Sequence, residues 1–360
     1  MPTLNKFFAA LTAVLFFCAA CDWGKPRRYQ AEFDGLFDTH AEIVGYAKSE
    51  AEFMRYASKI YDEVKTYSEL FDIYKNYDGI SNLKTVNDNA GIAPVAVDEK
   101  IIKFLLKCKE LYAETDYTVN IAMGSVLSLW HERREEGTAG ASKARLPDMP
   151  ALRAAADNTD ITRLVIDEDA GTVFLSEKGM SLDVGAIAKG YAASMAVREA
   201  AALGMTSMLV NMGGNIIAVG QPLDGARNRW GVGIQDPARA AGDVSNILDT
   251  VFVNDCALVT SGDYQRYYMV DGKAYGHIID PGTLMPAERY ASVTIIHQDS
   301  GLADALSTAL FILPEERGEA LLRRYGAEAL WVYRDGSVRY TEGYRAVSKT
   351  YGGASSAAEE

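Results

Sequence analysis

The chain has 360 residues, more than one compact hydrophobic core usually fills, so one large domain or two fused domains are expected. Hydrophobic residues make up 48% and charged residues 24%, the composition of a folded globular protein rather than a disordered or fibrous one. The 36 Lys and Arg against 49 Asp and Glu give a formal net charge of −13, and such a surface repels nucleic acid, so we expect no nucleic-acid partner. A polyanionic ligand would have to be bound by a local feature, such as a helix N-terminus, a lysine or a divalent cation.

The N-terminus resembles a bacterial lipoprotein signal. The apolar stretch Phe7–Ala20 has the length of a signal-peptide core and is shorter than the ~20 residues that a membrane-spanning helix needs. It ends in Cys18-Ala19-Ala20-Cys21, which resembles a lipobox, where cleavage leaves Cys21 as a lipidated N-terminus. We interpret 1–20 as a lipoprotein-type signal peptide and 21–32 as a tether. A plain secretory signal with an incidental cysteine is the alternative. The expected location is extracytoplasmic, anchored by lipid to a bacterial membrane, with the periplasmic side of the inner membrane favoured.

The first part of the chain predicts three amphipathic helices. Apolar residues recur three or four positions apart over Glu50 to Tyr74, and similar patterns cover 99–114 and 120–134. Residues 135–147 are charged, contain glycine and have no periodicity. They therefore predict a surface loop between a helical first part and a sheet-rich second part.

The second part predicts short strands joined by hairpins. Residues 164–175 predict a hairpin, and Ser181 to Val184 predict a strand that leads through Gly185 into a helix over 186–203. Further strand-like runs lie at 208–211, 216–219, 251–253, 258–261 and 293–296. Asp271-Gly272 and Asp335-Gly336 predict two-residue hairpin turns. Hairpin-linked strands with helices gathered elsewhere indicate an α+β fold with mixed or antiparallel sheets, not a doubly wound sheet.

Two glycine-containing turns suit an anionic ligand. Residues 182–190 read Leu-Asp-Val-Gly-Ala-Ile-Ala-Lys-Gly, a strand and a turn followed by a helix that opens with Lys189. Backbone amides, the helix dipole and the lysine there all favour phosphate. The second turn, Asn211-Met212-Gly213-Gly214-Asn215, lets the backbone approach a ligand closely. Either turn alone is equally explained as an ordinary junction between elements.

Two later segments carry side chains suited to catalysis and metal binding. Of four histidines, His277 is the best general-base candidate, because glycines, a carboxylate and a proline turn surround it. Packing or surface roles are expected for His40, His131 and His297. Asp304 and Thr308 are one helical turn apart, so their oxygens share a face in the manner that Mg²⁺ accepts. The simpler alternative is that Asp304 caps its helix while Thr308 hydrogen-bonds its own backbone.

In this order, the four segments resemble the signature of the ApbE family of flavin transferases. The resemblance covers roughly residues 33–345 and implies one catalytic domain with a T-fold-like fold, a flavin site between two subregions and a flexible tail over 346–360. It implies that FAD is bound by Phe37, Tyr74, Thr118, Val119, Asn120, Asp183, Lys189 and Ile278. It implies that Mg²⁺ is held by the backbone carbonyl of Ala186 with Asp304, Thr308 and Ser307. Two stretches depart from the family: Phe37-Asp38-Thr39 often reads Met-Gly-Thr, and Val119-Asn120 often reads Phe-Asp.

The activity that the resemblance implies is Mg²⁺-dependent transfer of FMN from FAD to a Thr or Ser hydroxyl of a partner protein, with release of AMP. His277 would accept the hydroxyl proton. The acceptor would belong to a membrane redox complex and carry a short Asp-x-x-Ser/Thr-Gly-Ala-Ser/Thr-like stretch, which this chain itself lacks. The alternatives are a FAD pyrophosphatase, in which water replaces the hydroxyl, and a non-catalytic flavin-binding lipoprotein. Tyr74 favours the transferase over the pyrophosphatase, because it could stack on the flavin and hold the dinucleotide.

Overall fold

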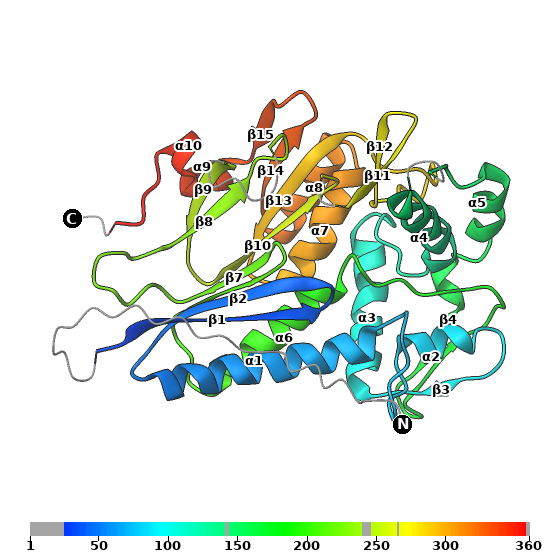
Figure 1. Cartoon of the computed structure of the whole chain (residues 1–360), viewed down its shortest axis with the longest axis horizontal. Helices are drawn as coiled ribbons and strands as arrows, with labels where there is room; N and C mark the ends of the chain where they lie inside the picture. The colour runs from blue at the N-terminus through cyan, green and yellow to red at the C-terminus, as the bar shows by residue number, and fades with distance from the viewer. Residues whose placement is uncertain (1–24, 141–143, 240–245, 265, 358–360) are drawn as a thin grey trace.

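The computed structural model describes residues 25–140, 144–239, 246–264 and 266–357 (Figure 1). The predicted signal peptide and Cys21 lie outside these ranges. Among the helices in the described ranges, none combines the length and apolar character that crossing a membrane requires.

An antiparallel sheet of eight strands forms the centre of the fold. In spatial order its strands are β1 (Arg27–Leu36), β2 (Thr39–Ala47), β6 (Met208–Met212), β7 (Asn215–Val219), β10 (Cys256–Gly262), β13 (Tyr290–His297), β14 (Glu328–Tyr333) and β15 (Val338–Tyr340). Each neighbouring pair runs antiparallel. Because the strands follow one another across the sheet in chain order, this is an α+β architecture, and the predicted fold class is confirmed.

Strand β1 begins inside the segment predicted as a tether. Arg27 pairs with Ala47 of β2, and the pairing continues along the strand. The side chains of Tyr29, Ala31 and Phe33 alternate with polar residues and pack into the core between the sheet and α1. The tether prediction is therefore wrong from Arg27 onward.

Helices cover one face of the sheet. The main ones are α1 (Glu50–Phe71), α3 (Glu99–Glu114), α6 (Ala188–Ala202), α7 (Ser300–Ile312) and α8 (Glu315–Tyr325). Figure 1 draws α1 and α6 below the sheet. The predicted helix over 99–114 has these bounds in the structure, while α1 ends at Phe71 and α6 begins at Ala188. The apolar stripes of these helices and the inner face of the sheet form the core.

A strand pair and two short helices cover the opposite face. They are β8 (Trp230–Gln235), β9 (Ile247–Val253), α9 (Glu342–Val347) and α10 (Lys349–Gly352). The buried Tyr344 hydroxyl donates to Asp249 Oδ2 over 3.0 Å, and Tyr351 stacks on Tyr340 with ring centroids 4.8 Å apart. The predicted tail from residue 346 thus begins inside α9, and the prediction is wrong as far as α10 because these aromatic contacts fix the chain to the sheet.

A smaller subregion lies beside the sheet, on the right of Figure 1. It contains α2 (Leu83–Asp88), α4 (Gly124–Ala139), α5 (Met149–Ala156), the short 3-10 helix Ile161–Arg163, β3 (Val95–Ala96), β4 (Leu164–Asp167), β5 (Thr172–Leu175), β11 (Tyr267–Val270) and β12 (Lys273–Gly276). Helix α4 continues to Ala139, so the predicted loop starts later than residue 135. The two-residue turn Asp271-Gly272 is confirmed, whereas Asp335-Gly336 lies within a longer connection between β14 and β15.

Candidate active site

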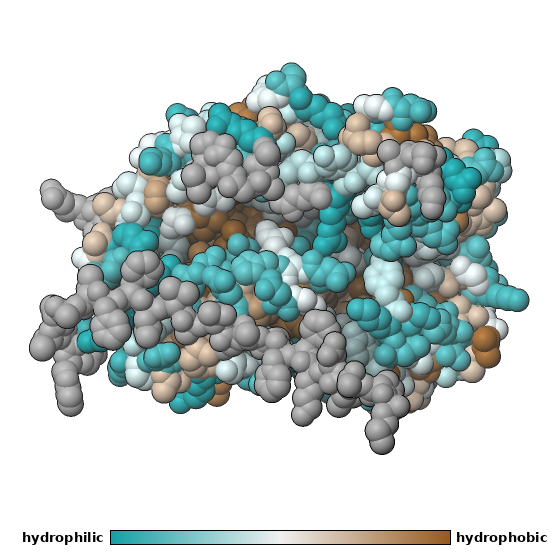
Figure 2. All heavy atoms as spheres, viewed as in Figure 1, coloured by the Kyte–Doolittle hydropathy of each residue, from teal (hydrophilic) through white to brown (hydrophobic). Residues whose placement is uncertain are grey.

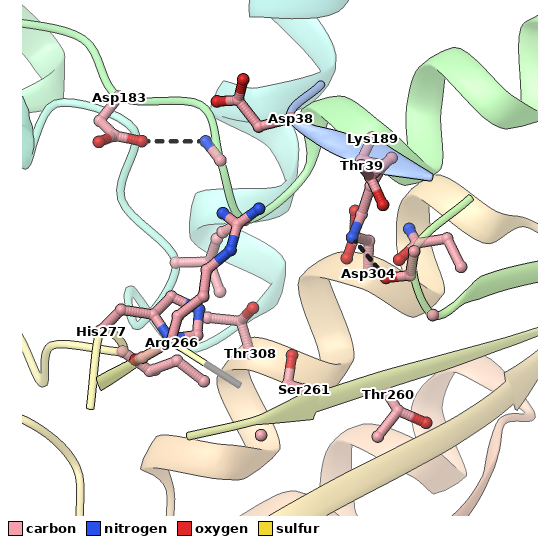
Figure 3. A pocket seen from close by; sticks show the side chains of 18 of the residues that line it. Asp38, Thr39, Asp183, Lys189, Thr260, Ser261, Arg266, His277, Asp304 and Thr308 are labelled. Carbon is pink, nitrogen blue, oxygen red and sulfur yellow. Dashed lines mark hydrogen bonds between the residues drawn. The ribbon is translucent and has the colours of Figure 1, made fainter. Parts of the chain in front are cut away.

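A cleft of about 750 Å³ opens between the end of the central sheet and the α4 subregion. Most residues predicted from the sequence line it: Tyr74, Thr118, Val119, Asn120, Asp183, Ala186, Lys189, His277, Ile278, Asp304 and Thr308. Figure 3 shows Asp183, Lys189, His277, Asp304 and Thr308 around one space. The fold therefore brings the separate sequence segments together.

Two predicted residues do not line the cleft. Phe37 packs at the edge of the core and donates its amide to Ser68 Oγ over 3.3 Å. Ser307 is fully buried, and its hydroxyl donates to the Asp304 carbonyl at 2.8 Å while its oxygen lies 2.7 Å from Ser261 Oγ. Because these interior hydrogen bonds occupy the Ser307 hydroxyl, we do not assign it to a metal.

A tight turn between β1 and β2 brings Asp38 and Thr39 to the cleft in place of Phe37. Phe37 and Asp38 both have φ of 51°, the left-handed conformation that a two-residue hairpin turn needs and that a phenylalanine rarely adopts. Thr39 then lies against Gly213, where an added Cβ would sit 1.8 Å from the Thr39 Oγ1. Gly213 is thus required for the close approach of Thr39, while the predicted approach of a ligand to this turn stays a prediction.

Asp304 is a buried carboxylate on α7, not the cap of that helix. The cap is Asp299, whose side chain accepts from the amides of Gly301 and Leu302. Asp304 Oδ2 accepts from the Gly190 amide of α6 over 2.8 Å. Burial raises the pKa of Asp304, while Lys189 and the Gly190 amide act in the opposite direction. The alternative reading of Asp304 as a helix cap is therefore wrong.

The surroundings of Asp304 fit a hard cation. The Gly190 amide donates to Asp304 and not to the carbonyl of Ala186 four residues earlier, so this carbonyl lacks the helical hydrogen bond, and Ala186 borders the cleft. Thr308 borders the cleft one turn after Asp304. A carboxylate, a hydroxyl and a carbonyl are donors that Mg²⁺ prefers, with water and phosphate completing its shell. In the described part of the chain, no three His, Cys, Asp or Glu side chains form a metal cluster.

Positive charge faces this carboxylate. Lys189 Nζ donates to the Gly213 carbonyl over 3.0 Å, and burial lowers the pKa of Lys189 while Asp304 raises it. Arg134 of α4 and Arg266 after β10 line the same cleft. In a chain with a net charge of −13, these cations supply the local attraction that an anionic ligand needs.

His277 is held as a neutral base. Its Nδ1 lies 3.2 Å from the Arg266 carbonyl oxygen, and a carbonyl can only accept, so Nδ1 carries the hydrogen and Nε2 is free to accept a proton. Burial lowers the pKa of His277 to about 4, and the nearby charges of Arg266 and Arg134 add to this. At neutral pH the imidazole is therefore unprotonated.

Two polar residues shape the loops of the cleft. Asp183 Oδ1 accepts from the Gly185 amide over 3.0 Å, and its enclosed position raises the pKa of this carboxyl group. Asn120 donates to the Thr159 carbonyl and accepts from the Ala122 amide, both over 2.9 Å. These contacts fix the backbone on either side of the space.

Helix α4 contributes residues that the sequence analysis missed. The His131 ring stacks on Tyr74 with centroids 5.3 Å apart, and Arg134 Nη2 lies 2.6 Å from His131 Nδ1. His131 was predicted to pack or to lie on the surface, but it lines the cleft, and His40 does so too. The available signal was helical spacing, since Leu127, His131 and Arg134 share one face of α4.

A cleft that combines cations, a neutral histidine and a buried carboxylate is typical of enzymes that act on the phosphates of a nucleotide. The sequence profile of the ApbE family matches residues 37–331. The chain belongs to the ApbE family.

Relatives of the chain have one name in common. A protein of Treponema pallidum (strain Nichols) named FAD:protein FMN transferase is 37% identical over 276 residues, which cover 73% of this chain and 74% of that protein. A Klebsiella pneumoniae (strain 342) protein of the same name is 32% identical over 257 residues, covering 71% and 76%. The crystal structure of the ApbE protein from Thermotoga maritima aligns with a TM-score of 0.76 at 29% identity, covering 89% of this chain and 99% of that one. Pseudomonas stutzeri flavinyl transferase ApbE shares the fold, with a TM-score of 0.73 at 24% identity over 92% of this chain and 99% of that one.

Proposed function

We propose that this chain is a flavin transferase that moves FMN from FAD to a Ser or Thr hydroxyl of a partner protein and releases AMP. Its membership of the ApbE family supports this activity, since relatives are named FAD:protein FMN transferase. The observation that carries the proposal is the cleft, where the neutral His277 shares one space with Lys189 and Asp304.

In the reaction, the acceptor hydroxyl oxygen attacks the phosphorus of the FMN half of FAD. A new O–P bond forms, and the bond between that phosphorus and the bridging oxygen breaks, so this oxygen leaves with AMP. His277 Nε2 accepts the hydroxyl proton. Lys189 and Arg266 stabilise the negative charge of the pyrophosphate, and positioning supplies much of the acceleration in phosphoryl transfer.

We assign the Ala186 carbonyl, Asp304 and Thr308 as the groups that would hold Mg²⁺. The bound ion would neutralise charge on the departing phosphate. Asp304 is the anionic member of the set. The hydrogen bond that its Oδ2 accepts from the Gly190 amide fixes the orientation of the carboxylate. Metal dependence of transfer is therefore part of the proposal.

Tyr74 supports a flavin at the rim of the cleft. Its side chain is 56% exposed although it is a large aromatic group, and such a ring suits stacking on the isoalloxazine. Partial burial of the phenol group, together with the nearby carboxylates of Asp183 and Asp38, raises its pKa to about 12, so the ring is uncharged at neutral pH. We assign the remaining FAD contacts to residues 118–120, Asp183, Lys189 and Ile278, which line the same cleft.

We further propose a lipid anchor at Cys21 after removal of 1–20. The enzyme would then face acceptor proteins of membrane redox complexes from the extracytoplasmic side, with the periplasmic face of the inner membrane favoured. The lipobox-like sequence supports this location.

The test is to incubate the chain lacking residues 1–21 with FAD, Mg²⁺ and a soluble domain that carries the acceptor stretch, and to weigh the products by mass spectrometry. We expect the domain to gain one FMN and AMP to appear, only when metal is present. Free FMN and AMP with unmodified acceptor would favour the pyrophosphatase, and intact FAD would contradict catalysis. Asp304→Asn keeps the side-chain shape, so this variant should melt like the parent and transfer nothing.

A further inference from the structure

The cleft extends to a part that no FAD or metal residue occupies. Strands β7, β8 and β10 line this part, which we call the β8 arm, through Gly214, Ile216, Gly233, Ile234, Leu258 and Thr260. The residues assigned to FAD and Mg²⁺ lie instead on the side formed by α1, α4, α6 and α7 and their loops. A reaction with two substrates needs room for both, so the β8 arm is available to the second.

The β8 arm is apolar and uncharged. Ile216, Ile234 and Leu258 pack with the core on the sheet face opposite α6 and α7. Figure 2 shows a hollow with hydrophobic walls where Figure 1 draws β7, β8 and β10. The other side of the cleft carries Lys189, Arg134 and Asp304. A pyrophosphate therefore suits the charged side, and an uncharged segment suits the β8 arm.

The β8 arm meets the charged side close to the reacting groups. The Gly213 carbonyl accepts the hydrogen bond from Lys189 Nζ over 3.0 Å, and Gly214 and Ile216 are one and three residues further along the chain. The Gly214 carbonyl accepts from the Thr260 amide of β10 over 3.3 Å, which joins the two strands at this point. A group at the inner end of the arm would therefore lie beside the lysine that faces the phosphates.

The backbone edge of β8 borders the arm. Gly233, Ile234 and Gln235 all line the cleft although they are consecutive. Successive side chains of a strand point to opposite faces, so three consecutive residues can share one cleft only where the strand presents its edge to it. Among the described strands, β8 pairs with β9 alone, so its other edge is not paired with a described strand. Such an edge can accept an extended peptide as an added strand.

We propose that the β8 arm binds the acceptor protein, as an extended segment that runs along β8, places its small or apolar residues in the arm and delivers its Ser or Thr hydroxyl to the FMN phosphorus. The inference rests on the proposed function and adds the surface that recognises the second substrate. Small residues around the hydroxyl would be required, because the arm must admit the backbone itself.

The test uses the full chain with Ile216→Cys, labelled after folding with a bulky maleimide. The substitution is small, so the protein should fold, and the label should then fill the arm. We expect labelling to reduce FMN transfer to a soluble acceptor domain by at least about tenfold while the affinity for FAD, measured by flavin fluorescence, stays within about twofold. The acceptor domain should also slow the labelling, and FAD alone should not.

Leu209→Cys is the matched control. Leu209 lies on β6, is half-buried and packs against the same core cluster as Ile216, but it does not line the cleft. Its labelling should change neither transfer nor FAD binding. The unsubstituted chain gives the background, which comes from Cys18 and Cys21 and is the same in all three proteins. Little is added by Cys108, which is buried, or by Cys256, whose pKa burial raises to about 12.

Other outcomes would overturn the inference. Loss of FAD affinity after labelling would mean that FAD, and not the acceptor, binds in the β8 arm. Unchanged FMN transfer after labelling would mean that the acceptor binds outside the β8 arm. If the unlabelled chain transfers no FMN, the proposed function fails, but protection of the introduced thiol by the acceptor domain would still support docking at the arm. Absence of protection of this thiol by the acceptor domain would contradict docking at the β8 arm.

Discussion

A histidine serves as a general base at neutral pH only if its imidazole is unprotonated and one nitrogen is available. For His277, the Arg266 carbonyl selects the tautomer, and burial together with two arginines suppresses protonation. Arg266 thus acts on the histidine twice, through its main chain and through its charge. The arginines that attract the phosphates also keep the base neutral.

The depressed pKa of His277 predicts how transfer depends on pH. The neutral base is present above about pH 4 and is lost as the pH falls through that value, so kcat/KM for FAD should show its His277-dependent acid limb near pH 4 rather than near 6.5. A pH series of transfer rates measures this limb. His277→Gln should lower the rate by about a hundredfold or more and remove the limb. An acid limb near pH 6.5 would contradict the low pKa and would mean that water solvates His277.

Arg134 is expected to bind the phosphates of FAD. Arg134→Met should weaken FAD binding by about tenfold and leave riboflavin, which has no phosphate, unaffected, because the lost contact is ionic. Arg133→Met is the control, since the neighbouring Arg133 pairs with Glu136 at 2.6 Å and does not line the cleft. Fluorescence titration gives both affinities. An equal loss of riboflavin affinity would instead mean that the substitution disturbs the stacked rings of His131 and Tyr74.

The residues predicted from sequence were those within ordered motifs. His277, Asp304 and Lys189 stand in short segments whose order along the chain is informative, and the fold gathers them in one cleft. His131 and Arg134 lie outside such motifs, on a helix whose polar face has no distinguishing pattern. Only the packing of α4 against α5 and the β11–β12 hairpin shows that this face points into the cleft.

At the scale of elements, the crossing of α6 and α7 holds the carboxylate in place. Gly190 makes this possible, because an added Cβ would lie 2.4 Å from the Ser300 carbonyl oxygen and 2.8 Å from Asp304 Cβ. Glycine inside a helix normally costs stability, so its presence here is explained by the close approach.

Gly190→Ala should therefore separate the two helices. We expect the free energy of unfolding to fall by about 1–3 kcal/mol from overpacking, and transfer to be lost because Asp304 moves. Urea denaturation measures the first effect and the mass assay the second. Gly301→Ala on α7 is the control, because the atom nearest to a Cβ there would be Asp299 Oδ1 at 3.3 Å, a contact that a small shift relieves. Unchanged stability of the Gly190 variant would contradict the close crossing.

Helices were more predictable than strands for a physical reason. The stripe over 99–114 matches the bounds of α3, since a helix buries one face through its own periodicity and Asp98 caps its start. Strand β1 shows only a short alternation, and its pairing with β2 depends on a turn in which Phe37 adopts a conformation that its residue type disfavours. The contacts of Tyr344 and Tyr351 that fix the C-terminal helices likewise exist only after the sheet has formed.

At the scale of the whole molecule, the net negative charge of the chain opposes the proposed attachment to a membrane. A net charge of −13 repels an anionic lipid surface, so the folded domain has no general electrostatic affinity for one. Attachment would depend on the lipid at Cys21. Because β1 begins at Arg27, the five intervening residues could span at most about 20 Å, which would hold the start of β1 near the membrane.

Cys21→Ser should release the enzyme from the membrane. In the producing bacterium, the parent should fractionate with membranes and the variant should appear in the soluble extracytoplasmic fraction or keep an uncleaved signal, because lipidation needs the thiol. Transfer by the purified variant should match the parent with a soluble acceptor, since Cys21 is far along the chain from the cleft residues, and should fall only with an acceptor embedded in membranes. Immunoblots of the fractions, with Cys256→Ser as the control that stays on the membrane, measure the difference. Continued membrane association of a cleaved Cys21→Ser protein would mean that the folded domain itself binds the membrane despite its charge.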